Sequence, residues 1–379
     1  MKIPFNKPFI VGKELSYIAK AVLDNSHLSG DGPFTKICHR WLEDNIGCKK
    51  AFLTTSGTAA IEMATVLFGL GRGDEVIMPS FTFVSTANAF VLRGAVPVFV
   101  DIREDTLNID ESLIEKAVTL KTKAIVPVHY AGYPCSMDKI MAIANKYGLR
   151  VIEDAAQGFL SSFGNKFLGT IGHAGCLSFH ETKNVISGEG GALILNDEKL
   201  TEKAEIIWEK GTDRKKFFRG EVDKYTWIDI GSSYPPSELI AAFLYAQLEH
   251  AEKILEKRRV IHKHYREKLI PLAIAEKFKL PPEQDGNNCN SHIFYILTRS
   301  PEERNSLIKY LKRHGVNAVF HYTPLHSSPA GLRYTRTFGK LLVTDYASKR
   351  LLRLPMHYEM TMADVEFVVS KIEKFYNKK

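Results

Sequence analysis

Between residues 50 and 200 the chain alternates short apolar, β-rich runs with stretches whose apolar residues recur at helical spacing. The helical pattern over 136–148 begins at Ser136, which we expect to be its N-cap. Apolar strands that alternate with helices predict a mostly parallel sheet covered on both faces, and the predicted fold class is therefore α/β. We expect strands over 75–81, 95–102, 124–130, 149–156, 175–180 and 191–196.

The C-terminal third has a different pattern. A helical stretch over 237–270 predicts one long connecting helix, and a polar, turn-rich segment follows at 280–290. Beyond it we expect a strand, a helix, a strand and a helix over 291–298, 300–315, 316–322 and 361–376. Ser300 with Glu303 forms a capping-box pattern, and Thr361 with Asp364 a looser version of it.

The domain boundary is expected near the start of the connecting helix. Residues 1–250 would form a large α/β domain, and residues 251–379 a smaller α+β domain. The large domain would begin with a helix from Leu15 to Asn25, broken by the turn residues of 29–34. One face of that helix is apolar, with Leu15, Ile18, Ala19, Val22 and Leu23.

Composition narrows the class of protein. The chain is 45% hydrophobic and 25% charged, which is ordinary for a globular protein, and its apolar runs are too short to span a membrane. The N-terminal stretch has no apolar signal core, and the five cysteines form no CxxC pair, so we expect a cytoplasmic protein with free thiols.

The net charge of +8 is dispersed along the chain, without a nucleic-acid-binding motif. The one basic cluster, over 213–227, can be a solvated loop or a site for a small anionic ligand.

The first motif with chemical meaning is "TTSGTAAIEMA" over 54–64. Ser56, Gly57 and Thr58 stand where a helix begins, so the first amides of that helix are unpaired and lie at the positive end of its dipole. Such a turn can bind a phosphate. A capped helix that follows a strand explains the same residues.

Two further motifs follow predicted strands. Asp154 in "VIEDAAQG" stands at the carboxyl end of a strand, where a carboxylate can pair with a protonated pyridine nitrogen or simply begin a turn. Lys183 follows the strand at 175–180. If it is partly desolvated, it can lose its proton and attack an aldehyde, although a turn lysine is usually solvated. Ser178 could bind the same phosphate as the turn at 56–58. Together these motifs predict a site for pyridoxal 5′-phosphate.

With these residues the chain resembles the DegT/DnrJ/EryC1/StrS family of sugar-nucleotide aminotransferases, which have the type I pyridoxal phosphate fold. The resemblance extends from "PFNKPFIVGKEL" to "RLLRLPMHYEM", which is nearly the whole chain. Within the family it is closest to the transaminases that make dTDP-4-amino-4,6-dideoxygalactose. The motifs that carry it include "GDEVIMPSFTFVSTANAFVLRGA", "SFHETKN", "GEGGA", "FFRGEVDKYTWIDIGSSY" and "FHYTPLH".

The resemblance implies cofactor roles for individual residues. Lys183 binds the aldehyde and Asp154 faces the pyridine nitrogen, and these two are the predicted catalytic residues. Gln157 lies near the phenolic oxygen of the cofactor, and Phe83 stacks on its ring, unless Phe83 is a core aromatic residue on a strand. Many members of the family have Asn-x-Arg where this chain has "GSSYPPS" over 231–237. The phosphate would be held by Gly57, Thr58 and Ser178, with Ser233, in place of the asparagine, reaching it from a neighbouring subunit.

The substrate contacts are also implied by the resemblance. The sugar nucleotide would bind in a cleft between subunits, lined by the loop 29–34 and by the basic segment, with Lys216 and Arg219 as candidate diphosphate contacts. His180 and His321 could touch the substrate, or they could be core or capping histidines. No metal site is expected, because no suitable ligands are spaced around either histidine.

The implied reaction moves the amino group of L-glutamate to C4 of dTDP-4-dehydro-6-deoxy-D-glucose. The products would be dTDP-4-amino-4,6-dideoxy-D-galactose and 2-oxoglutarate, for a surface polysaccharide such as enterobacterial common antigen or O-antigen. A homodimer or higher homo-oligomer is implied, without a nucleic-acid or membrane partner. The alternatives are a 3-keto sugar acceptor, a gluco-configured product, or a pyridoxal phosphate-binding regulator. A dehydratase of this fold would have histidine at position 183.

Overall fold

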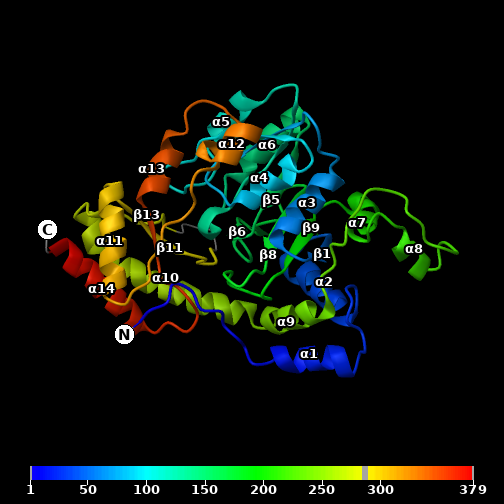
Figure 1. The fold of residues 1–379 in the computed structure, drawn as a ribbon, viewed down its shortest axis with the longest axis horizontal. Helices are drawn as coiled ribbons and strands as arrows, with labels where there is room; N and C mark the ends of the chain where they lie inside the picture. Colours follow the sequence, from blue (N-terminus) through cyan, green and yellow to red (C-terminus); the bar gives the residue numbers. More distant parts are fainter. Residues whose placement is uncertain (1, 284–288, 378–379) are drawn as a thin grey trace.

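An eight-stranded sheet forms the centre of the larger part of the molecule, in the order β1-β9-β8-β5-β4-β2-β3-β12 (Figure 1). The computed structural model describes residues 2–283 and 289–377. β9 runs antiparallel to both of its neighbours, and the other neighbouring pairs are parallel, which confirms the predicted mostly parallel α/β fold. The strands are β1 (Lys50–Thr54), β2 (Glu75–Pro79), β3 (Val96–Val100), β4 (Thr122–Ile125), β5 (Arg150–Asp154), β8 (Ala174–Ser178), β9 (Gly191–Leu195) and β12 (Arg336–Thr337).

Helices cover both faces of this sheet because its strands are apolar on both sides. In β2, for example, Val76 and Met78 enter the core on one face, and Ile77 enters the core on the other. The first face packs against α3 (Gly57–Leu67), α4 (Val84–Val91) and α7 (Thr201–Trp208). The second face packs against α2 (Pro33–Ile46), α5 (Glu111–Ala117), α6 (Met137–Tyr147) and α9 (Glu238–Leu248).

A smaller antiparallel sheet, in the order β10-β11-β13, lies at the other end of the molecule. Its strands are β10 (Phe278–Lys279), β11 (Phe294–Thr298) and β13 (Leu351–Leu354), and it packs on α10 (Ala251–Ile274), α11 (Pro301–Arg313) and α14 (Met362–Asn377). The remaining helices include α8 (Arg214–Phe218), α12 (Pro329–Tyr334) and α13 (Leu342–Arg350), and β6 (Ser162–Phe163) pairs with β7 (Lys166–Phe167).

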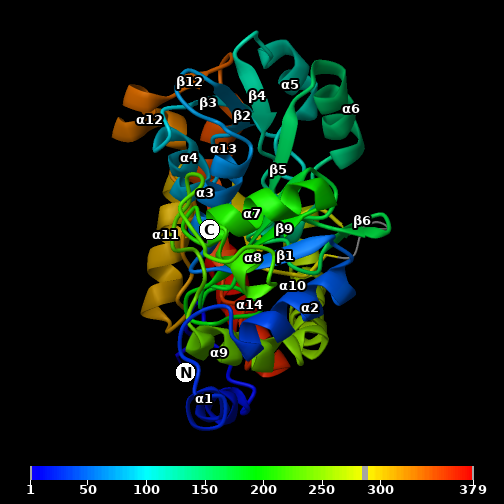
Figure 2. The same cartoon turned by 90° about the vertical axis from the view of Figure 1, so that its right-hand side faces the viewer.

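The two parts exchange segments of chain. Ile3, from the N-terminus, joins the core of the smaller part and pairs with Val316. In the opposite direction, β12 comes from the C-terminal third and pairs with β3 of the large sheet. Figure 2 shows β12 and α12 beside β2 and β3. The division of the chain into two domains at residue 250 stays a prediction. Ile3 and β12 each pack on the part of the molecule that lies on the other side of that boundary.

Several local predictions were wrong. The helix expected over 237–270 is two helices, because His250 leaves the helical backbone between α9 and α10. The strand expected over 316–322 forms only isolated bridges, since Val316 pairs with Ile3 and Val319 pairs with Arg353. Ser136 stands at the N-cap of α6, but its side chain makes no capping hydrogen bond. Part of the polar segment expected at 280–290 lies outside the described residues.

Both capping patterns of the C-terminal third are confirmed. Ser300 Oγ accepts a hydrogen bond from the Glu303 amide at 3.1 Å, and Thr361 Oγ1 accepts one from the Asp364 amide at 3.2 Å. These bonds satisfy amides that the first turns of α11 and α14 cannot pair internally.

Among the helices of the described residues, none combines the length and the apolar character that a membrane span requires.

The first helix, α1 (Glu14–Leu23), forms where expected but does not bury its apolar face. Leu15 and Leu23 are 78% and 75% exposed, while Glu14 and Ala21 are buried. Glu14 accepts hydrogen bonds from the amides of Val11 and Gly12 and from the Gln247 side chain, so polar contacts orient the helix. In Figures 1 and 2, α1 lies below α9, at the edge of the molecule.

The start of α2 is held by a buried carboxylate. Glu238, on α9, accepts hydrogen bonds from the amides of Gly32, Phe34 and Thr35 and from the Thr35 hydroxyl, at 2.5–3.1 Å. It thereby fixes the end of the loop 29–34, because these amides have no partner within the first turn of α2.

We expect Glu238→Ala to lower the free energy of unfolding by about 3 kcal/mol, because it leaves three buried amides without an acceptor. Chemical denaturation followed by circular dichroism measures this change. The matched control is Glu256→Ala on the exposed side of α10, which should change stability by no more than about 0.5 kcal/mol. Equal stability of the two variants would contradict the assigned role.

Candidate active site

A cleft of about 800 Å³ lies between the carboxyl edge of the large sheet and the smaller part of the chain. On the sheet side its walls are the N-terminal turns of α3 and α4, the ends of β5 and β8, and the turn after β8. On the other side they are His292, the segment 319–323 and β13. Open α/β sheets bind ligands at this edge, where loops after several strands converge.

The N-terminus of α3 forms an anion cradle in the cleft. Ser56 is its N-cap and accepts the amide of Ala59 at 3.0 Å, while no acceptor in the described part of the chain takes the amides of Gly57 and Thr58. The cradle packs closely on the sheet, since a Cβ on Gly57 would lie 2.8 Å from Cβ of Ser178. Ser178 lines the same cleft, so two free amides and nearby hydroxyls converge where a phosphate can bind.

Asp154 ends β5 on the floor of the cleft and is buried. Its Oδ2 accepts a hydrogen bond from Thr86 Oγ1 at 2.7 Å, and Thr86 in turn contacts Thr82 Oγ1 at 2.7 Å. Its Oδ1 accepts the amide of Ala156 at 3.2 Å. Both oxygens therefore accept, as those of an ionised carboxylate do, and the side chain can pair with a cationic ring nitrogen.

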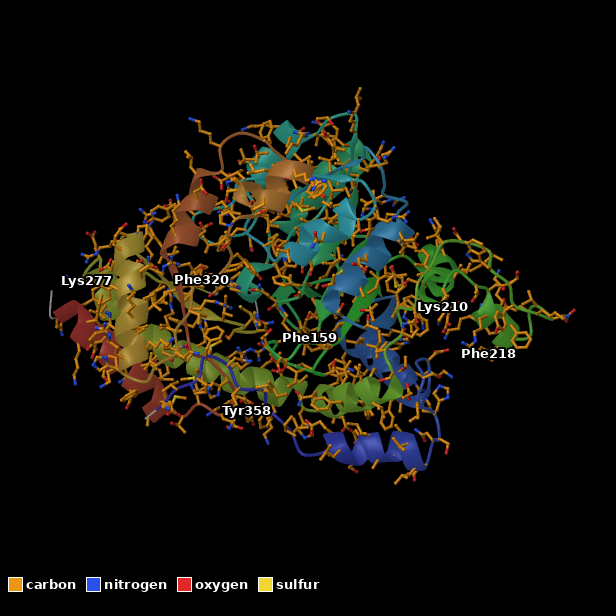
Figure 3. All side chains as sticks on the ribbon, viewed as in Figure 1. Phe159, Lys210, Phe218, Lys277, Phe320 and Tyr358 are labelled. Carbon is orange, nitrogen blue, oxygen red and sulfur yellow. The ribbon has the colours of Figure 1, made fainter. Side chains whose placement is uncertain are left out.

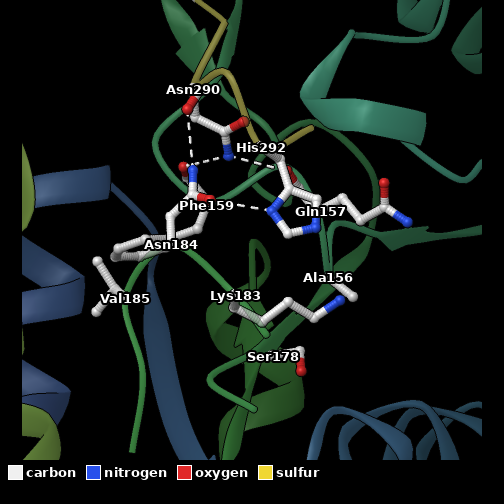
Figure 4. A pocket seen from close by; sticks show the side chains of 9 residues that line it. All are labelled: Ala156, Gln157, Phe159, Ser178, Lys183, Asn184, Val185, Asn290 and His292. Atoms are coloured by element: carbon white, nitrogen blue, oxygen red, sulfur yellow. Dashed lines mark hydrogen bonds between the residues drawn. The ribbon is translucent and has the colours of Figure 1, made fainter. Parts of the chain in front are cut away.

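The turn that carries Lys183 is fixed from behind (Figure 4). Asn184 Nδ2 donates to the carbonyl of Asn290 at 2.9 Å, and Asn184 Oδ1 lies 3.0 Å from His292 Nδ1. The Asn290 side chain in turn donates to the carbonyl of Gln157 at 2.8 Å. In Figure 4 the Lys183 side chain extends away from this network, and its amine ends beside Ala156.

The pKa of the Lys183 amine is lowered from 10.5 to about 8, chiefly because burial disfavours the charged form. The negative charge of Asp154 acts in the opposite direction and raises this pKa, whereas the positive charge of Arg353 lowers it. With a pKa of about 8, about a tenth of the amine is neutral at pH 7, against about 0.03% for an ordinary lysine. The amine is thus prepared to attack an aldehyde.

We expect the rate at which the protein, freed of cofactor, captures pyridoxal 5′-phosphate to rise with pH through a midpoint near 8. The sign follows from the pKa, because only the neutral amine attacks and the neutral fraction grows as pH rises through it. Stopped-flow absorbance of the bound cofactor between pH 6 and 10 measures the midpoint. A midpoint above pH 10 would show that the amine is solvated.

Phe83, Gln157 and Tyr322 also line the cleft. Phe83 precedes α4 and is 57% exposed, so the alternative of a core aromatic residue on a strand is wrong. Gln157 Oε1 accepts the Ala131 amide at 2.7 Å, and its Nε2 donates to the Tyr322 hydroxyl at 2.6 Å. The predicted contacts of Phe83 and Gln157 with the cofactor remain predictions.

The histidines predicted to contact the substrate lie on the cleft wall. His180 lines it beside Glu189, with His180 Nε2 3.6 Å from Glu189 Oε1. His321 Nδ1 lies 2.6 Å from the Tyr130 hydroxyl, its ring stacks on Tyr322, and burial lowers the pKa of the imidazole. In the described residues, no group of three or more histidine, cysteine or acidic side chains is arranged to hold a metal ion.

Three other predicted site residues do not line the cleft of their own chain. Ser233 is exposed and forms a bridge with Glu209. Lys216 forms an ion pair with Glu202, and Arg219 forms ion pairs with acidic side chains at 2.6 and 2.9 Å. Figure 3 shows Phe218, between the two basic residues, at the far end of the molecule from Phe320 on the cleft wall.

Sequence reasoning missed two arginines and a threonine pair at this site. Arg258 and Arg353 line the cleft, and Thr82 and Thr86 hold Asp154. Two signals were available in the sequence. An arginine interrupts the apolar run "LLRLPM", and the threonines of "FTFVST" are four residues apart, which places them on one face of a helix start.

The comparisons with known proteins agree with this geometry. The sequence profile of the DegT/DnrJ/EryC1/StrS aminotransferase family matches residues 10–373. The chain is 38% identical over 325 residues to a pleiotropic regulatory protein of Geobacillus stearothermophilus, covering 85% of this chain and 83% of that protein. It is 31% identical over 382 residues to a GDP-perosamine synthase of Escherichia coli O157:H7, covering 100% and 99%.

A solved structure has the same fold. The crystal structure of a DegT DnrJ EryC1 StrS aminotransferase from Brucella abortus superposes with a TM-score of 0.87 at 31% identity, covering 96% of this chain and 95% of that one.

Proposed function

The chain belongs to the DegT/DnrJ/EryC1/StrS aminotransferase family, as its sequence motifs predicted, and from this premise we propose which amino group it moves and to which sugar. The donor is L-glutamate, and the acceptor is C4 of dTDP-4-dehydro-6-deoxy-D-glucose. The products are dTDP-4-amino-4,6-dideoxy-D-galactose and 2-oxoglutarate, and the amino sugar serves a surface polysaccharide such as enterobacterial common antigen or O-antigen.

The protein is a sugar aminotransferase that depends on pyridoxal 5′-phosphate. One observation supports the assignment of its site: the amine of Lys183, the carboxylate of Asp154 and the free amides of Gly57 and Thr58 line a single cleft. They match the aldehyde, the ring nitrogen and the phosphate of the cofactor. When bound, the cofactor supplies an aldehyde and a ring that stabilises the negative charge developing at the substrate carbon.

The residues of the chain supply the proton transfers. The Lys183 amine, with its lowered pKa, takes the proton from Cα of the donor and, as an ammonium, gives one to C4 of the acceptor. Asp154, fixed by Thr86 and the Ala156 amide, stabilises a cationic ring nitrogen without having to reorient. Phe83 forms one wall of the cleft and excludes water from one side of the reacting atoms.

The choice of acceptor has two supports. The relative from Escherichia coli that matches the whole chain is named for a GDP-linked sugar, which favours a nucleotide sugar here. The dTDP nucleotide, the C4 position and the galacto configuration follow from the motifs shared with the dTDP-4-amino-4,6-dideoxygalactose branch. A 3-keto acceptor or a gluco-configured product would use the same cofactor residues.

A regulatory role is the second candidate, since the relative from Geobacillus stearothermophilus is named a pleiotropic regulatory protein. The lysine, aspartate and amide cradle are all present in this chain, and the relative that matches its whole length is named a synthase. We therefore place the enzyme first. Glutamate-dependent turnover separates the two roles, because a protein that only binds the cofactor makes no 2-oxoglutarate.

We also propose that the protein is a cytoplasmic homodimer or higher homo-oligomer. Phe218 and Trp227, on the segment 213–230, have side chains that are 63% and 78% exposed. Lys216, Arg219 and Ser233, on or next to this segment, are predicted ligand contacts but do not line the cleft of their own chain. A second subunit packed on this segment would explain both observations, because it would cover the aromatic side chains and bring its own cleft to the three predicted contacts. Light scattering after size-exclusion chromatography tests the oligomeric state, and a monomeric active enzyme would reject the proposal.

The proposed cytoplasmic location has its own support. The five cysteines are free and buried, which suits a reducing compartment.

The experiment that tests the function uses the purified holoenzyme with L-glutamate and dTDP-4-dehydro-6-deoxy-D-glucose. We expect 2-oxoglutarate and an amino sugar whose H3–H4 coupling constant in the proton NMR spectrum is small, because the C4 amine is axial in the galacto configuration. A large coupling constant would indicate the gluco product. Failure to use this ketone, together with turnover of a 3-keto sugar, would reject the proposed acceptor.

A further inference from the structure

A small cavity adjoins the cleft beside the Lys183 side chain. Its volume is about 10 Å³, which is about the least that holds one water molecule. Gln157, Ser178, Lys183 and His292 line both the small cavity and the cleft, so the two spaces share a wall of polar side chains. A water molecule in the small cavity would therefore lie next to the amine that takes the proton from the donor.

The ring of His292 is held in one orientation and one tautomer. Asn184 Nδ2 donates to the carbonyl of Asn290 at 2.9 Å, which leaves the other amide atom, Oδ1, to contact His292. Because Asn184 Oδ1 can only accept, the hydrogen of that 3.0 Å contact belongs to His292 Nδ1. In the neutral imidazole Nε2 is then an acceptor, on the ring edge turned away from Asn184. The backbone is fixed too, since Arg258 donates to the His292 carbonyl.

The acceptor at His292 Nε2 is available near neutral pH. Burial lowers the pKa of His292 well below its usual value, and nearby positive charges, first that of Lys183, lower it further. In the part of the chain that the structure describes, no group donates a hydrogen bond to Nε2. In Figure 4 the ring lies between Asn184 and Gln157, above the side chain of Lys183. A free acceptor and the reacting amine thus line the same small cavity.

Transamination consumes one water molecule for each amino group that leaves its donor. We infer that His292 Nε2 holds this water in the small cavity and directs its oxygen toward the donor carbon, an inference that rests on the proposed amino-acid donor. The bond between that carbon and the transferred nitrogen breaks. The water oxygen becomes the keto oxygen of 2-oxoglutarate, and the two hydrogens end on the nitrogen that stays with the cofactor, so no further reactant is needed.

A structural role for His292 is the alternative, because its contact with Asn184 also supports the turn that carries Lys183. The two roles affect different steps. Lys183 removes the Cα proton before water is needed, and this removal is reversible. Loss of the group that holds the water therefore slows only the release of 2-oxoglutarate, whereas a disturbed Lys183 turn slows proton removal as well.

The test uses the holoenzyme with L-glutamate alone, in D₂O. Rapid quenching and mass spectrometry measure two products of one reaction mixture: glutamate with deuterium at Cα, and 2-oxoglutarate. His292→Phe removes the acceptor and keeps a flat ring, while His292→Gln keeps an acceptor near the position of Nε2. The matched control is His314→Gln, because His314 is exposed, packs on the Tyr310 ring and lines neither the cleft nor the small cavity.

For His292→Phe we expect the release of 2-oxoglutarate to slow about 10- to 100-fold relative to deuterium incorporation. His292→Gln should recover part of this loss, and His314→Gln should match the wild type. Both rates come from the same protein sample, so their ratio does not depend on the fraction that is folded and loaded.

A second measurement needs no cofactor. Long-range ¹H–¹⁵N NMR of the cofactor-free protein with labelled histidine should show the His292 ring, identified by its absence from His292→Gln, with the hydrogen on Nδ1 at pH 7. A protonated ring, or a hydrogen on Nε2, would reject the inference.

Equal slowing of deuterium incorporation and release in His292→Phe would assign His292 to the support of the Lys183 turn and overturn the inference. Failure of the proposed function is distinguishable. The sugar ketone is absent from this assay, so a wrong acceptor does not affect the ratio. A wild type that leaves L-glutamate unexchanged would reject the proposed donor, and the ratio would then be measured with the amino acid that the enzyme does exchange.

Discussion

Replacing Lys183 by alanine is expected to lower kcat by at least about 10⁴-fold, the largest effect of any single substitution in this chain. The substitution removes both the amine that binds the cofactor aldehyde and the base that takes the proton from the donor. Among the described residues that line the cleft, Lys183 is the only lysine, so no second amine is in place to bind the aldehyde. Turnover is measured as 2-oxoglutarate released from L-glutamate in the presence of the sugar ketone.

A second measurement on Lys183→Ala is independent of turnover. Sodium borohydride should fix pyridoxal 5′-phosphate covalently to the wild type and leave the variant unlabelled, as read by mass spectrometry. The exposed Lys166, in β7, gives the matched control, and Lys166→Ala should keep both the label and the activity. Labelling of the Lys183→Ala protein at one other lysine, with activity retained, would move the site elsewhere.

Asp154→Asn should lower kcat by about 10²- to 10³-fold while the protein stays folded. Asparagine has nearly the same shape and can still accept the Thr86 hydrogen bond, so the main change is the loss of a negative charge. Without that charge a cationic ring nitrogen is no longer stabilised. The exposed Asp138 in α6 serves as control, and Asp138→Asn should leave kcat within about twofold of the wild type.

The same variant gives a spectroscopic readout with a definite sign. The charge of Asp154 raises the pKa of Lys183, so its removal should lower that pKa and move the midpoint of cofactor capture below pH 8. Arg353→Gln should move the midpoint the other way, because Arg353 lowers the pKa of Lys183. A shift in the same direction for both variants would show that these charges do not act directly on the amine.

Much of this site could be predicted because its motifs are local. The turn at 56–58 and Lys183 each follow an apolar strand by a few residues, and Asp154 is the last residue of another. A parallel sheet brings the carboxyl ends of its strands to one edge. The sequence alone therefore determined that an amide cradle, a carboxylate and an amine share a cleft. The capping boxes at Ser300 and Thr361 were predictable for the same reason, since three residues settle them.

Other features depended on contacts between distant parts of the chain, which no local pattern records. The apolar face of α1 is exposed because Glu14 and Gln247 orient that helix. β12 joins a sheet whose neighbouring strand lies more than 200 residues earlier. Arg353 faces Lys183 only because the smaller part of the chain folds back over the edge of the large sheet. Sequence periodicity thus determined the elements and the chemistry at their ends, whereas long-range packing decided which charges act across the cleft.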